Sequence, residues 1–87
     1  MNPNIAQQAK DQLAALPRDR EEALRTEWRK ACAAIETHML ARRPKPRSFE
    51  VHHVIETARK AFLSAFVRGE ALATLVDTAL TAAGVAP

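Results

Sequence analysis

Helix-breaking residues divide this chain into four segments, and this division restricts its possible folds more than any other feature. Prolines stand at positions 17, 44 and 46, and the chain has only two glycines, Gly69 and Gly84. Proline lacks a backbone N–H, and glycine favours the left-handed turn at a helix end. Between these points, eighteen alanines occur and no β-branched run alternates with polar residues. The pattern predicts an all-α fold, a small bundle of three to four helices.

The first two segments each show signals for a helix start and stop. The first helix is expected to begin at Asn2 or Asn4 as N-cap and to end at Pro17. The second begins at Asp19, followed three positions later by Glu22 in a pattern typical of a capping box, and continues until Pro44. Residues spaced four, three, four and four apart form one apolar stripe on this second helix: Leu24, Trp28, Ala31, Ile35 and Met39.

Two more helices are expected after the prolines. The third begins with Ser48 as cap, carries an apolar side from Val51 to Phe66 and breaks at Gly69. The fourth follows from residue 70 to Gly84 and is apolar except for a narrow polar stripe. The 44–47 connection is short, so the second and third helices should form a central antiparallel hairpin with facing stripes. We therefore expect a single helical domain over residues 1–87.

Composition narrows the class of protein. The single cysteine, Cys32, excludes an internal disulfide and favours a reducing, cytoplasmic setting. No segment has the roughly 18 apolar residues of a membrane span, so no membrane partner is expected. Arginine outnumbers lysine nine to four, which together with the alanine content suits a bacterial or phage chain. A chain of this length obtains little stability from one core, so self-association as a homo-oligomer is expected.

Metal binding and catalysis find little support in the sequence. His38, His52 and His53 flank the 44–47 loop, but the spacings of zinc ligands are missing and Cys32 lies about two turns from His38. Catalytic nucleophiles need a nearby base and donors for developing charge, and no glycine-rich turn supplies such donors. The carboxylates lie among basic residues, with i,i+4 pairs expected for Glu21 with Arg25 and for Glu56 with Lys60. We therefore expect that the chain is not an enzyme and that it binds neither a cofactor nor a metal ion.

One local run accounts for the positive charge of the chain. Arg42, Arg43, Lys45 and Arg47 carry four charges, whereas the rest of the chain holds nine basic and ten acidic groups. The first two are expected in the last turn of a helix, where cations complement the exposed carbonyls. The prolines should hold the connection extended and turn the other two outward. We therefore interpret the loop mainly as a hinge between two helices, and the alternative interpretation is a contact surface for nucleic acid or an acidic partner. Phe49 is the only aromatic residue nearby that could stack on a base.

The excess of apolar surface gives the functional hypothesis. The chain is expected to act without catalysis, as a small regulator, adaptor or inhibitor that binds another protein and itself. Trp28 is interpreted as a core residue first and as an interface anchor second. The fourth helix supplies a stripe to pack on the hairpin, and small residues beside it let a second copy approach. The candidate contact residues on that helix are Leu72, Ala73, Leu75, Val76, Ala79, Leu80, Ala82 and Ala83. The alternative hypothesis is a nucleic-acid-binding accessory protein that uses residues 42–47.

Overall fold

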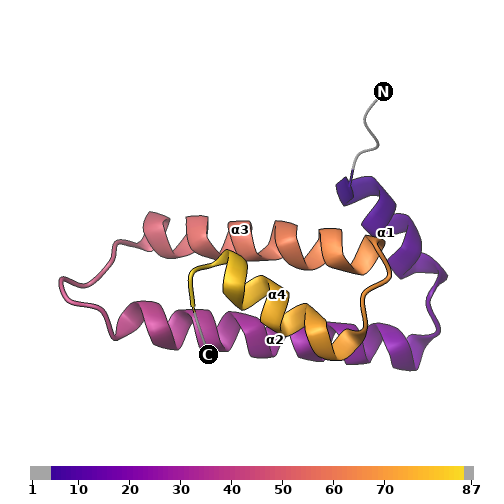
Figure 1. The fold of residues 1–87 in the computed structure, drawn as a ribbon, viewed down its shortest axis with the longest axis horizontal. Helices are drawn as coiled ribbons and strands as arrows, with labels where there is room; N and C mark the ends of the chain where they lie inside the picture. Colours follow the sequence, from indigo (N-terminus) through magenta and orange to yellow (C-terminus); the bar gives the residue numbers. More distant parts are fainter. Residues whose placement is uncertain (1–4, 86–87) are drawn as a thin grey trace.

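The computed structural model describes residues 5–85, which fold into four helices joined by short connections (Figure 1). The helices are α1 (Ile5–Ala15), α2 (Arg18–Leu40), α3 (Ser48–Val67) and α4 (Leu72–Ala82). No strand occurs within this range. The predicted all-α bundle and its antiparallel hairpin of α2 and α3 are confirmed. The proposed caps Asn2 and Asn4 lie outside the described residues.

The last helix completes the core of the hairpin. Figure 1 shows α4 lying across α2 and α3, and α4 contacts both helices more extensively than they contact each other. The predicted facing stripes of α2 and α3 therefore meet only in part, since α4 supplies Leu75 and Ala79 to their shared core. Fully buried alanines on the three helices allow this close approach: Ala31, Ala58, Ala65 and Ala79.

Glycines end α3 and α4 as the sequence predicted. Gly69 and Gly84 have φ angles of +82° and +76°, in the left-handed region that glycine enters without steric cost. After Gly69, the N–H of Glu70 donates to the Ala65 carbonyl at 3.1 Å. After Gly84, the N–H of Val85 donates to the Leu80 carbonyl at 2.9 Å, and Val85 is itself buried. These bonds satisfy carbonyls that a helix end otherwise leaves unpaired.

The helix starts differ from the sequence prediction. The N-cap of α2 is Pro17, whose carbonyl accepts the N–H groups of Arg20 and Glu21, so Asp19 already lies inside the first turn. Proline suits this place because it has no N–H that needs a partner. Likewise, α3 includes Ser48 as its first residue, and α4 begins at Leu72 rather than at residue 70. The predicted Asp19 and Ser48 caps are wrong, because the two helices begin one or two positions earlier, with Pro17 and Arg47 as their N-caps.

The first helix packs mainly on α3 and leaves a corner open beside α2. Ala9 of α1 is buried, while Leu13 and Leu16 are partly buried against the core. The extensive contacts of α1 are with α3, and α1 rises away from α2 in Figure 1. Apolar side chains at the start of α2 are therefore covered only in part.

Candidate functional site

Two hollows lie where α1 meets the other helices, and both reach Leu24 of α2. The first has a volume of about 360 Å³ and the second about 310 Å³. We call them together the apolar cleft. The first is lined by Leu16, Arg20, Ala23, Leu24, Phe66, Glu70, Leu72 and Leu75. The second is lined by Leu13, Leu24, Arg25, Trp28, Arg59, Phe62 and Leu63.

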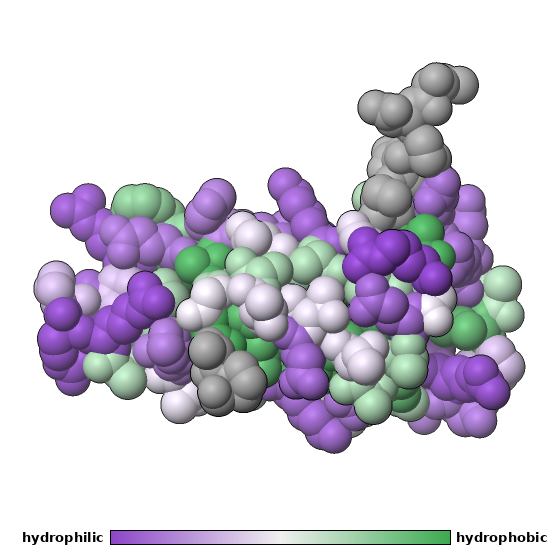
Figure 2. Space-filling model, viewed as in Figure 1, coloured by the Kyte–Doolittle hydropathy of each residue, from purple (hydrophilic) through white to green (hydrophobic). Residues whose placement is uncertain are grey.

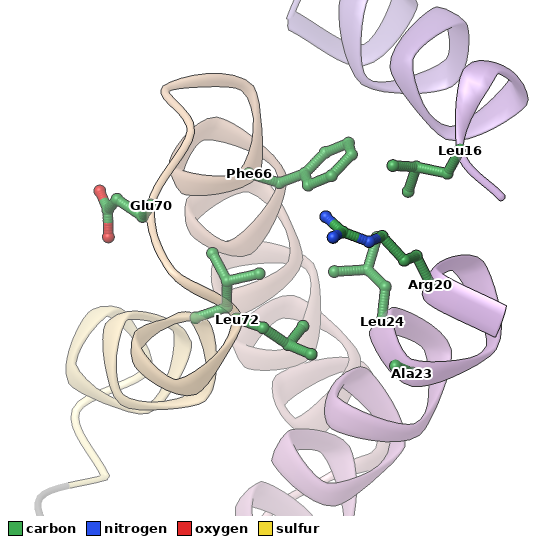
Figure 3. A pocket seen from close by; sticks show the side chains of 8 residues that line it. Leu16, Arg20, Ala23, Leu24, Phe66, Glu70 and Leu72 are labelled. Atoms are coloured by element: carbon green, nitrogen blue, oxygen red, sulfur yellow. The ribbon is translucent and has the colours of Figure 1, made fainter.

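Side chains from all four helices or their ends converge on the first hollow (Figure 3). Leu16 follows the end of α1, Phe66 lies near the end of α3 and Leu72 begins α4. The Arg20 side chain reaches across the hollow toward Phe66, and Arg20 forms no ion pair within residues 5–85. The hollow thus combines apolar walls with one cation at its mouth.

Glu70 lines the same hollow but turns its carboxylate away from it (Figure 3). The Arg68 guanidinium donates to Glu70 Oε2 from Nη2 at 2.6 Å and from Nε at 3.1 Å. The Thr78 hydroxyl donates to Glu70 Oε1 at 3.3 Å. Glu70 therefore connects the end of α3 to α4, and the charge of Arg20 in the hollow is not neutralised by it.

Trp28 forms the wall between the core and the second hollow. Its indole is half-buried, and its ring centroid lies 5.3 Å from that of Phe62, with the ring planes inclined by 58°. This tilted arrangement is favourable for aromatic pairs. The residue packs against the core cluster and also lines the open cleft.

The predicted contact residues of α4 fall into three groups. Leu75 and Ala79, only 1% and 0% exposed, belong to the core of the chain itself. Val76, Leu80 and Ala83 are half-buried against that core. The three that remain exposed are Leu72, Ala73 and Ala82. In Figure 2 the surface over α4 is mostly pale, of intermediate hydropathy.

The four loop cations gather at the opposite end of the bundle from α1. Arg42, Arg43, Lys45 and Arg47 are all exposed around the α2–α3 connection, where Figure 2 shows mainly hydrophilic residues. Because α2 ends at Leu40, Arg42 and Arg43 lie beyond the helix rather than in its last turn. Arg43 Nη1 nevertheless donates to the carbonyl of Leu40 at 3.2 Å. It thereby has the helix-end role that the sequence suggested.

The acidic side chains and histidines of the described residues form neither a metal-binding group nor all of the predicted ion pairs. Within residues 5–85, no three His, Cys, Asp or Glu side chains are grouped closely enough to hold a metal ion. The predicted ion pair of Glu21 with Arg25 is confirmed at 2.9 Å, whereas Glu56 contacts Arg59 at 3.8 Å instead of Lys60. In the same part of the chain, no helix has the length and apolar character needed to cross a membrane.

Cys32 of α2 has a thiol with a raised pKa. Burial raises the pKa of its thiol above the ordinary value, and the nearby Glu36 carboxylate raises it further. Such a shift keeps the thiol protonated at neutral pH, which is the opposite of what a catalytic nucleophile requires.

Comparison with known proteins gives no match to a family model, to a curated protein or to a solved structure. The chemistry of the exposed surface is therefore the guide to function. Sequence reasoning missed the cleft because Leu16 and Phe66 have the spacing of ordinary core residues. Their position at helix ends, next to Pro17 and close to Gly69, was the available signal, since side chains there are covered by fewer neighbours.

Proposed function

We propose that this chain is a small, non-enzymatic protein-interaction module that binds another protein through the apolar cleft and also associates with itself. It acts as a regulator, adaptor or inhibitor by occupying a surface of its partner. The single free cysteine, Cys32, and the arginine- and alanine-rich composition support a cytoplasmic setting in a bacterium or phage-infected cell.

The observation that carries the proposal is the chemistry of the first hollow. Leu16, Phe66 and Leu72 border a space of about 360 Å³, a size within the range of specific binding pockets. The open mouth leaves these apolar atoms accessible, and Leu72 is 39% exposed. A partner helix that inserts a large apolar side chain there would bury them. A carboxylate on the partner, placed beside that side chain, would pair with Arg20.

The proposal is tested by capturing partners with the full-length tagged chain in its source organism and identifying them by mass spectrometry. The informative variant is Leu72→Glu, which places a charge in the hollow. Leu72 is the first residue of α4, where a carboxylate interacts favourably with the helix dipole, so the fold should change in stability by no more than about 0.5 kcal/mol. Thermal unfolding checks this directly.

Ala33→Glu is the matched control, because Ala33 is an exposed residue of α2 outside both hollows. We expect a protein that is enriched with wild type and with Ala33→Glu but lost with Leu72→Glu. The same set of captured proteins with wild type and Leu72→Glu would refute binding through the cleft. Arg20→Gln should weaken the captured complex and reduce its dependence on salt concentration.

A further inference from the structure

A second surface, at the end of the bundle opposite α1, has a different chemistry. Two hollows lie there, with volumes of about 540 and 620 Å³. The first is bordered by all four loop cations and the second by Phe49, His52 and His53. Both hollows are also lined by Met39, Arg42 and Glu50, so they adjoin one another. We call this surface the basic end.

Apolar side chains stand exposed beside the charges. Phe49 is 65% exposed and Leu40 is 51% exposed, and they are the two most exposed large hydrophobic residues of the described chain. Phe49 lies in the first turn of α3, directly after the loop cations. An exposed aromatic ring costs free energy in water, and the hollow beside it is lined by Arg42, two histidines and two carboxylates, Glu50 and Glu56.

We propose that the basic end binds single-stranded nucleic acid, with the loop cations on the phosphates and Phe49 stacked on a base. Flexible single strands expose their bases, whereas a duplex keeps them stacked inside. Only the single strand presents a flat aromatic partner for Phe49 and a phosphate within reach of the loop at the same time. The two carboxylates of the hollow have partners within the chain, because Glu50 accepts the Arg47 backbone N–H at 3.4 Å and Glu56 lies 3.8 Å from the Arg59 guanidinium. This binding is independent of the apolar cleft.

The probe is a fluorescently labelled twelve-nucleotide oligothymidylate, with binding measured by anisotropy between 50 and 200 mM NaCl. Four phosphate contacts to a single strand give a log–log salt slope of about −3, so affinity should fall roughly 50-fold over this range. Lys45→Gln should weaken binding at 50 mM and make the slope shallower by about 0.7. Arg18→Gln is the control, because Arg18 is an exposed cation paired with Glu22 at the other end of the bundle.

Phe49 separates stacking from simple charge attraction. Phe49→Leu keeps an apolar side chain but removes the aromatic face, so affinity should fall roughly tenfold with an unchanged salt slope. Unchanged affinity of Phe49→Leu would overturn the proposal, as would equal binding of a twelve-base-pair duplex. Polyglutamate that competes at least as well as unlabelled oligothymidylate at the same charge concentration would also overturn it, and would assign the basic end to an acidic protein.

Discussion

The indole of Trp28 on α2 packs at an incline of 58° against the ring of Phe62 on α3, with 5.3 Å between the ring centroids. This contact joins the two long helices on the side that borders α1. Both rings line the second hollow, whose lining includes no residue of α4. Since α2 and α3 contact each other less extensively than each contacts α4, the aromatic pair is an important direct connection within the hairpin.

Trp28→Ala is expected to lower the free energy of unfolding by roughly 2–3 kcal/mol. Complete burial would put the loss at about 3–5 kcal/mol, but Trp28 is only half-buried. For a domain of this length the thermal midpoint should drop by more than about 8 °C. Circular dichroism during heating measures it. Trp28→Phe, which retains an aromatic partner for Phe62, should lose less than about 1.5 kcal/mol. Equal midpoints for wild type and Trp28→Ala would show that the residue serves an interface alone.

Gly69→Ala should destabilise the chain by about 1–2 kcal/mol through its backbone alone. The φ angle of +82° is unfavourable for an L-residue, while an added Cβ would meet no atom within 4 Å. Gly69→Asn should cost less, since asparagine tolerates this conformation better. Urea unfolding of the two variants provides the comparison. If alanine and asparagine were equally harmful, a lost contact rather than the φ angle would be the cause.

The raised pKa of Cys32 predicts slow reaction with thiol reagents. The thiolate is the reactive form, so at neutral pH Cys32 should react more slowly than cysteine in an unfolded peptide, and its rate should rise with pH to above pH 9. Glu36→Gln removes the carboxylate charge, which is the smaller of the two causes of the raised pKa after burial, and should speed the reaction at pH 8. Glu22→Gln, on the same helix but three turns away, should not change the rate. A chromogenic disulfide assay follows the kinetics, and a reaction as fast as that of the unfolded peptide would contradict the burial argument.

Self-association is expected to use the exposed alanines of α4. Ala73 and Ala82 are accessible, and small side chains allow a second helix to approach closely in a two-fold arrangement. Light scattering should therefore show a mass above that of the 9.6 kDa chain at high micromolar concentration. Ala73→Glu and Ala82→Glu should return the protein to a monomer, because each would bury an unpaired charge. Ala33→Glu should associate as wild type does. A monomeric wild type would eliminate the proposal.

Local signals in the sequence were sufficient to predict the four helices and the breaks between them. Pro17, Gly69 and Gly84 act through their own backbone chemistry, which needs no information from distant residues. The caps were harder, since Asp19 and Ser48 are chemically suitable yet lie one or two positions inside the helix starts. The exact start of a helix varies by one or two residues, so a polar residue that is suitable as an N-cap does not by itself identify the cap.

The arrangement of the helices was less predictable than their existence. A stripe such as that of α2 shows which side is covered but not which helix covers it, and here α4 provides much of the cover. For the same reason the apolar cleft could not be predicted. The exposure of the loop cations was predictable, because long charged side chains on a short loop extend into solvent. Phe49 was noticed in the sequence, but its exposure could not be predicted, because it depends on the apolar side of α3 beginning only at Val51.

The order of the helices along the chain has a consequence for synthesis. A ribosome releases α2 and α3 before the residues of α4 that complete their core, among them Leu75 and Ala79. During that interval Ile35 and Phe62 have no complete cover, and chaperones or proteases can reach them. A chain that ends at Gly69 therefore cannot complete this core and is expected to be a substrate for degradation. Ile35 and Phe62 gain their full cover only when α4 has left the exit tunnel and packed on α2 and α3.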